Sequence, residues 1–337
     1  MPKPATRIKT LFVKIFLLFI FLLTACTTAT QKQPAVSQAR IYNDFILVKA
    51  TEKDTLSSLA AEYLNDSTKD WLIAEFNDNK TITPGQKSII PLKHFYKGGI
   101  KSTGYQTVPV LLYQGFSKDK AGRRIVAEAD FEAQMKYLKE NGYHVIMLEQ
   151  LLDFIDFKEQ IPEKSVVITI DDGWRSFYDI AYPILKKYGF SATLFVYTDF
   201  IGGRKAMSWE QIKEISENGF DIQCKTRTHR NLARLKEKES FKEYFESIEK
   251  EISYPKKLVK QKLRKDCSCL AYPYGATNNI VIAILKKDGY RAAFIVKPRS
   301  NPFFVDNFRI QRSEIYGKYD IERFKKMLSV FQKMELK

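Results

Sequence analysis

The residues with the clearest chemical potential are two adjacent carboxylates, Asp171 and Asp172, followed by Gly173. They end the apolar run 165–170, whose β-branched residues predict a buried strand. Because side chains alternate along a strand, the two carboxylates point in different directions. One can therefore hold a metal ion while the other takes a proton from metal-bound water. The alternative is an ordinary polar strand end that leads into a turn.

Three further motifs occur in a fixed order around these carboxylates. They are residues 108–113, 226–232 and 270–275, with the carboxylates between the first and the second. Together the four motifs resemble the polysaccharide deacetylase (NodB-homology, carbohydrate esterase) family, over a stretch that runs from about Val108 to the C-terminus. The resemblance implies an α/β fold, a distorted (β/α) barrel, that removes N- or O-acetyl groups from glycans.

The same resemblance implies roles for single residues. Asp171 would be the general base, and Asp172 would bind a divalent metal, zinc or similar. His229 matches the second histidine of a His-x-x-x-His metal motif, and Tyr274 would offer a backbone N–H to the oxyanion. Such a metal lowers the pKa of bound water and polarises the acetyl carbonyl, and the N–H meets the charge that develops.

One departure from the family concerns the metal itself, because Lys225 replaces the first histidine of that motif. A lysine binds metal only as the neutral amine, and deprotonating it at pH 7 costs roughly 4–5 kcal/mol. We therefore expect an ammonium that pairs with Asp172 in the metal's place, leaving no activated water. Two functions remain open: a metal-dependent deacetylase, and an inactive glycan-binding relative that needs no cofactor.

Histidines are missing at two other places where the family has them. Gln114 follows Tyr113 where relatives have Tyr-His, and no histidine follows His229 to act as general acid. We interpret His94 as a solvated connector residue and His144 as structural.

Three more residues have two interpretations each. Trp174 either stacks on a sugar ring or fills the barrel rim. Arg309 and Arg312 either orient Asp171 through a bidentate contact, as an arginine does in relatives, or lie on a surface strand.

The elements that must position these residues alternate between strands and helices, which predicts a parallel sheet or barrel. Active-site groups in such folds gather at the carboxyl ends of the strands. Asp171, Asp172, Lys225, His229 and Tyr274 all follow predicted strands. The expected helices are 128–141, 178–188 and one capped by Ser208; the expected strands are 191–197, 220–224, 269–272 and 292–295.

The N-terminus has the pattern of a bacterial lipoprotein leader. Four cations precede the apolar run 15–23, and residues 23–26 match a lipobox, which implies cleavage before Cys26 and lipid on its thiol. An ordinary secretory signal and an uncleaved anchor are the alternatives. The pattern predicts export to the cell envelope and a lipid anchor in a membrane.

Domain boundaries follow from composition and from a second resemblance. Residues 1–25 form the leader, 26–44 a polar tether, 94–107 a linker and 108–337 the deacetylase-like domain. Residues 45–93 resemble a LysM domain, which implies binding to glycans rich in N-acetylglucosamine. The expected partner is therefore an N-acetylated glycan, either peptidoglycan or an exopolysaccharide.

Charge and cysteine content limit the partners and the disulfide pairings that we expect. The net charge is +16, which suggests attraction to anionic envelope material. The basic residues are scattered rather than clustered with aromatics, so we expect no nucleic-acid partner. Beyond Cys26 three cysteines remain, so at least one is unpaired within the chain. A bridge from Cys224 to Cys267 or to Cys269 is open.

Overall fold

The computed structural model describes residues 38–93 and 97–334. The predicted leader, the predicted lipidation site Cys26 and His94 lie outside the described residues. No helix of these two ranges is long and apolar enough to cross a membrane.

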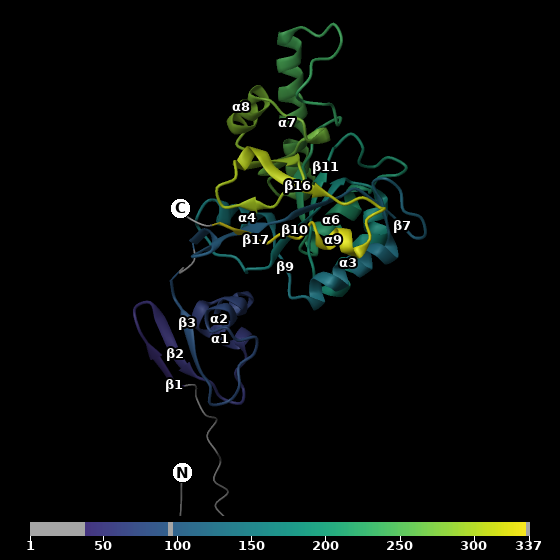
Figure 1. The fold of residues 1–337 in the computed structure, drawn as a ribbon. Helices are drawn as coiled ribbons and strands as arrows, with labels where there is room; N and C mark the ends of the chain where they lie inside the picture. Colours follow the sequence, from purple (N-terminus) through teal and green to yellow (C-terminus); the bar gives the residue numbers. More distant parts are fainter. Residues whose placement is uncertain (1–37, 94–96, 335–337) are drawn as a thin grey trace, which may run out of the picture.

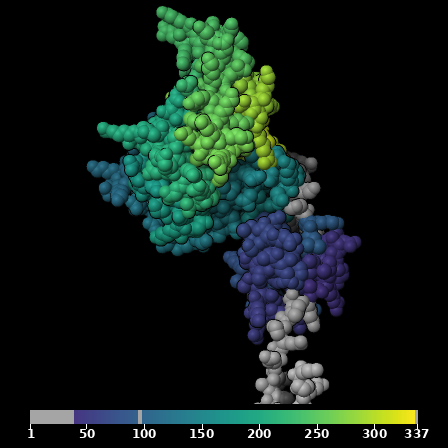
Figure 2. Space-filling model, turned by 180° about the vertical axis from the view of Figure 1, so that it is seen from behind, coloured from purple at the N-terminus to yellow at the C-terminus, as the bar shows by residue number. Residues whose placement is uncertain are grey.

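The N-terminal part of the described chain is a small α+β unit that forms its own lobe beside the larger domain (Figures 1 and 2). Its antiparallel sheet has the strand order β1-β2-β3, and two helices pack on it. The side chains of Val48, Leu59, Ile73 and Ile90 form its buried core. The elements are β1 (Gln38–Ile41), β2 (Phe45–Lys49), α1 (Leu56–Leu64), α2 (Asp70–Phe76) and β3 (Lys87–Pro91).

Strand β1 lies in the stretch that we expected to be a polar tether. It pairs with β2 in the register Gln38↔Lys49 to Ile41↔Ile46. An edge strand is held mainly by backbone hydrogen bonds, so its polar composition gave no sign of the pairing. The ordered unit therefore begins before residue 45.

The expected linker 94–107 also contains regular structure. A four-stranded sheet joins this segment to strands from near the C-terminus, and β17 pairs with β5 at Phe331↔Gln106. Gly104 has a φ of 151°, and a Cβ there would lie 2.0 Å from the carbonyl oxygen of Gln332. The strands of this four-stranded sheet are β4 (Ile100–Lys101), β5 (Gly104–Val108), β15 (Asn301–Pro302) and β17 (Phe331–Lys333).

The larger domain is a parallel barrel, as predicted. Within the described chain, seven strands close in the order β10-β11-β12-β13-β14-β16-β6, and β6 pairs again with β10. The barrel strands are β6 (Val110–Tyr113), β10 (Ser165–Asp172), β11 (Thr193–Val196), β12 (Asp221–Cys224), β13 (Cys269–Ala271), β14 (Ala292–Val296) and β16 (Ile310–Glu314). The short strand β9 (His144–Val145) extends the sheet beside β10, while β7 (Gly115–Ser117) and β8 (Ile125–Ala127) form a separate pair.

Helices surround the barrel (Figure 1). The expected helix at 178–188 begins as a π-helical turn, Phe177–Ala181, and continues as α5. Ser208 caps α6 as predicted, accepting a hydrogen bond from the backbone N–H of Gln211. The helices are α3 (Glu128–Glu140), α4 (Leu148–Ile155), α5 (Tyr182–Tyr188), α6 (Trp209–Glu217), α7 (Phe241–Leu263), α8 (Asn279–Lys287) and α9 (Ile321–Lys325).

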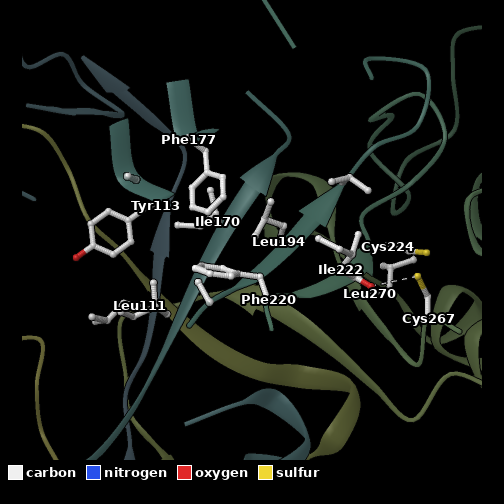
Figure 3. Packing of buried hydrophobic residues seen from close by; sticks show 14 of the residues in the cluster. Leu111, Tyr113, Ile170, Phe177, Leu194, Phe220, Ile222, Cys224, Cys267 and Leu270 are labelled. Carbon is white, nitrogen blue, oxygen red and sulfur yellow. Dashed lines mark hydrogen bonds between the residues drawn. The ribbon is translucent and has the colours of Figure 1, made fainter. Parts of the chain in front are cut away.

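Two apolar layers form the core of the barrel domain. One lies between strands and helices and includes Ile170, Leu194 and Ile222 (Figure 3). The other fills the barrel interior and includes Val167, Phe195 and Ile310, among others. Strands such as β10 and β11 contribute to both layers because their side chains alternate.

The three cysteines of the described chain are buried and free, so neither of the open disulfide pairings forms. The thiol of Cys267 instead lies 3.7 Å from the carbonyl oxygen of Ile222 (Figure 3).

Candidate active site at the strand ends

Alternation along three strands brings three charged side chains to the same end of the barrel. Val167 and Ile310 face the interior, so Asp171 and Arg312 reach the interior further along strands β10 and β16. Cys224 packs in the outer layer, so Lys225, the next residue along the chain, turns inward. All three charged side chains are almost fully buried.

These groups form a buried ion network. The Lys225 ammonium lies 3.0 Å from Asp171 Oδ2 and 2.5 Å from Asp172 Oδ1. The Arg312 guanidinium binds Asp171 in a bidentate manner, at 2.7 Å and 3.1 Å. Two carboxylates thus face two cations, which is how a protein compensates charges that it removes from water. The prediction that Lys225 pairs with Asp172 is confirmed.

Asp172 has further partners around its carboxylate. Gln114 donates a short hydrogen bond to Oδ2, and the Trp174 indole N–H donates to the same oxygen at 3.2 Å. The His229 Nε2 atom lies 3.4 Å from Oδ1. Burial alone would raise the pKa of Asp172, but His229, the Lys225 charge and the hydrogen bonds from Lys225 and Gln114 hold that pKa well below its usual range. Asp172 is therefore ionised in the folded protein.

The backbone at the site is held in an uncommon conformation. Asp172, His229 and Tyr274 have φ values of 78°, 66° and 61°, in the left-handed region that non-glycine residues seldom adopt. Gly173 follows with a φ of 97°, and a Cβ there would lie 2.5 Å from the side chain of Ile201. Such strain persists where the surrounding structure imposes it, as it does at functional sites. At Asp172 the backbone is left-handed, and the adjacent carboxylates of Asp171 and Asp172 both contact the Lys225 ammonium.

Aromatic rings border the carboxylates on one side. The Tyr197 and Tyr274 rings lie 5.1 Å and 5.0 Å from the His229 ring, centroid to centroid. Phe200 links Tyr197 to Trp174, at 5.0 Å and 4.8 Å. Burial, with a smaller contribution from Asp172, raises the pKa of Tyr197, so its hydroxyl stays protonated. The rings form an aromatic wall that we define by these five residues.

The donor set does not fit the divalent metal that the resemblance implies. Such a site needs three protein ligands, and in residues 38–93 and 97–334 no group of three or more His, Cys, Asp or Glu side chains could hold a metal ion. Asp172 and His229 stand close enough to share a cation. The cation that contacts Asp172 Oδ1 is the Lys225 ammonium, and a metal would compete with it for the same oxygen.

The structure separates the two candidate arginines. Arg312 orients Asp171, as one of the two interpretations held. Arg309 does not: its guanidinium binds Asp306 at 2.7 Å and Asn279 at 3.0 Å in an exposed turn, so that assignment is wrong. Arg312 lies two residues beyond the inward-facing Ile310, whereas Arg309 belongs to a 3₁₀ turn that precedes the strand.

The remaining candidates lie as follows. Trp174 belongs to the rim and is tied to Asp172. His144 lies in β9, which pairs with the amino end of β10, the end away from the carboxylates. Sequence reasoning missed Tyr197 and Phe200, although both follow β11 and the carboxyl-end rule points to them. It also missed Arg124, which binds Glu314 at 2.7 Å beside the site.

Comparisons with known proteins agree on the kind of domain. The family model described as polysaccharide deacetylase matches residues 158–293. YxkH of Bacillus subtilis (strain 168), a protein named for the polysaccharide deacetylases, is 31% identical over 59% of this chain and 68% of its own length. The poly-β-1,6-N-acetyl-D-glucosamine N-deacetylase of Staphylococcus aureus (strain MRSA252) is 29% identical over 55% of this chain and 67% of its own.

A solved structure supports the fold. The Streptococcus pyogenes deacetylase PplD in complex with acetate superposes with a TM-score of 0.60 at 24% identity, covering 67% of this chain and 99% of PplD. At that identity the likeness concerns the barrel architecture.

Proposed function

The chain belongs to the polysaccharide deacetylase family, hydrolases of N-acetyl amide bonds, and from that premise we propose that it binds an N-acetylated amino-sugar glycan at its strand ends. We propose further that the Lys225 ammonium takes the place of the family's metal, so that the native chain recognises the glycan without releasing acetate. The single observation that carries the proposal is the contact of Lys225 with both carboxylates.

Both oxygens of the candidate base accept hydrogen bonds within the ion network. Asp171 Oδ1 accepts from Arg312, and Oδ2 accepts from both Arg312 and Lys225. A general base needs a lone pair within hydrogen-bond reach of the proton it takes. Asp171 is therefore suited to holding Lys225 and Arg312 in place, rather than to activating a water.

Glycan recognition is supported by the aromatic wall beside the network. The Tyr274 side chain is 62% exposed, an unusual exposure for a ring that also contacts His229. Exposed aromatic rings offer apolar faces on which sugar rings stack, and Tyr hydroxyls can bind sugar hydroxyls. A small hollow of about 50 Å³ lies between Tyr274, Lys225 and Asp171.

Metal analysis and acetate release test this function. The native chain and Lys225→His are dialysed against zinc or cobalt, and metal content, binding of an N-acetylated chito-oligosaccharide and acetate release are measured for both. We expect the native chain to bind the oligosaccharide without stoichiometric metal or acetate release, and Lys225→His to gain metal affinity. Lys225→Gln serves as the control, since it removes the ammonium but adds no ligand. Stoichiometric metal with acetate release by the native chain would overturn the proposal.

A second candidate is metal-dependent N-deacetylation by the native chain. The observation that favours it is the convergence of Asp171, Asp172 and His229 beside Tyr274, the set implied for catalysis. It requires that Lys225 leave Asp172 when substrate binds. Action on O-acetyl groups would use the same residues and a different pocket shape.

We also propose that the small unit is a LysM-like module that binds glycans rich in N-acetylglucosamine. Its two helices against an antiparallel sheet support this, and so do the residues of the sequence pattern. The lipobox at Cys26 supports a lipid-anchored protein of the cell envelope. In this arrangement both glycan-binding units would act close to a membrane surface. Incorporation of labelled fatty acid by the native chain, and its loss in Cys26→Ala, tests the anchor.

A further inference from the structure

We infer that the glycan bound by this chain is anionic, and that its acidic groups lie in a basic groove that leads away from the ion network. The groove consists of two neighbouring hollows that share Arg123. Its cationic lining residues are Lys118, Arg123, Arg124, Arg175, Lys205, Lys318 and Arg323. This inference rests on the proposed function, because it names the class of glycan that the same site would receive.

The groove is continuous with the candidate site. Gln114 and Arg124 line both the small hollow at the carboxylates and the first hollow of the groove, of about 730 Å³. Trp174 lines this first hollow too and donates to Asp172, so the groove begins at the ion network. Arg123 then connects it to the second hollow, of about 850 Å³. Hollows of this size accommodate ligands larger than one sugar.

Several cations of the groove have no acidic partner. Arg124 binds Glu314 at 2.7 Å, and Arg175 lies 3.7 Å from Asp179. For Lys118, Arg123 and Lys205, by contrast, the described part of the chain provides no ion pair, and all three are exposed. Exposed cations that line one concave surface raise the local concentration of anionic ligands.

The second hollow is lined by both cations and aromatic rings. Tyr316 and Tyr319 pack edge to face at 5.4 Å, and the Arg323 guanidinium lies 5.5 Å from the Tyr319 ring centroid. Lys318 adds an exposed ammonium at the same hollow and has no ion pair among the described residues. The arrangement suits a ligand with both apolar faces and negative charges.

A glycan fits this lining better than other polyanions do. The first hollow is largely apolar: Phe116, Ile125, Ile180 and the Trp174 ring line it beside the cations. Sugar rings present apolar faces between polar edges, and a carboxylated glycan adds charge at those edges. A polyanion without rings would use the cations and leave the apolar lining exposed.

The test compares two glycans that differ only in charge. The full chain is titrated with an N-acetylated chito-oligosaccharide, and with the same oligosaccharide oxidised to carboxylates at its primary hydroxyls. We expect the carboxylated form to bind about tenfold more tightly at low salt, the effect of a few exposed charge pairs, and the advantage to shrink as ionic strength rises. Polyglutamate of equal charge is the third ligand.

Two double variants locate the effect. Arg123→Gln with Lys205→Gln removes two unpaired cations of the groove, and should abolish most of the carboxylate advantage, measured as the ratio of the affinities for the two glycans. The matched control is Lys250→Gln with Lys257→Gln on α7, where both lysines are exposed and lack ion pairs in the described chain. The control variant should bind both glycans as the native chain does.

Each remaining outcome counts against the inference. Equal binding of both glycans by the native chain overturns it and leaves the proposed function standing. Polyglutamate binding as tightly as the carboxylated glycan shows a site for charge alone, which also overturns it. Binding of neither glycan overturns the proposed function, and this inference with it.

Discussion

Two acidic sites of this molecule, one buried and one half-buried, respond to removal from water in opposite ways. At the strand ends, Asp171 and Asp172 are enclosed together with Lys225 and Arg312. At the junction of the small unit and the barrel, Glu75 on α2 accepts a hydrogen bond from the backbone N–H of Glu163 at 2.8 Å.

The pKa shifts of the two sites show what compensation achieves. Burial and the charge of Glu163 raise the pKa of Glu75 to about 7, although the hydrogen bond from the Glu163 backbone N–H and the charge of Lys101 oppose the rise. Burial also acts on Asp172, yet His229, Lys225 and Gln114 reverse the sign and lower its pKa. A buried carboxylate thus stays charged only where cations and donors are built around it. The barrel provides them, and the junction does not.

We expect the largest loss of stability when the cation that compensates the buried carboxylates is removed. Lys225→Met removes the cation that contacts both buried carboxylates, and breaking a buried ion pair costs about 3–5 kcal/mol. Urea unfolding of the native chain and the variant measures this cost. Adding Asp172→Asn to Lys225→Met should recover part of the loss, because it removes the uncompensated charge. A loss below about 1 kcal/mol, the scale of an exposed pair, would mean that Lys225 is not a buried partner.

A smaller, opposite effect is expected at the junction. Because the folded-state pKa of Glu75 is raised from 4.5 to about 7, the folded state binds more protons than the unfolded state between these values. Stability of the small unit should therefore fall as the pH rises from about 4.5 to about 7. Glu75→Gln, which keeps the acceptor for the Glu163 N–H, should remove this dependence and stabilise the unit by about 1–2 kcal/mol above pH 7, after allowance for solvent screening.

The fluorescence of Trp71 reports on unfolding of the small unit when the other two tryptophans are replaced, in a protein that also carries Trp174→Phe and Trp209→Phe. Asp172 gives the contrasting sign, since a lowered pKa contributes stability that is lost only as the pH falls below the unfolded value near 3.8. Between pH 5 and pH 8 Asp172 should therefore add no pH dependence. If the stability of Glu75→Gln changed with pH as steeply as that of the native protein, the pH dependence could not be assigned to Glu75.

The smallest effect concerns a single donor at the network. Trp174→Phe removes the indole N–H that Asp172 Oδ2 accepts at 3.2 Å, while keeping a ring against Phe200. We expect a loss of about 1 kcal/mol, the net value of one hydrogen bond with a charged acceptor that keeps its other partners. Thermal unfolding at pH 7 measures it, and Trp209→Phe is the control. No difference between the two variants would show that Gln114 and Lys225 suffice for Asp172.

Much of the site was predictable from the sequence because strand periodicity fixes direction. The alternation along β10 and β16 places Asp171 and Arg312 on the barrel interior. The family resemblance also marked Lys225 as standing where a histidine is expected. Arg309 could not be separated from Arg312 without knowing where the strand begins. The pairing of β1 with β2 escaped prediction because the composition of β1 is polar. The pairing of β5 with β17 escaped it because the two strands are distant in the sequence.

The sequence by itself determined the alternation of strands and helices, the position of the carboxylates at a strand end and the presence of a lysine where the family resemblance leads one to expect a histidine. Only the tertiary structure decided that the ammonium of this lysine contacts both carboxylates, that Gln114 reaches Asp172 across the barrel, and that the unpaired cations line a groove next to it. The physical reason is that local periodicity sets which way a side chain points. Its charge partners come from other strands, and they are fixed only when the barrel closes.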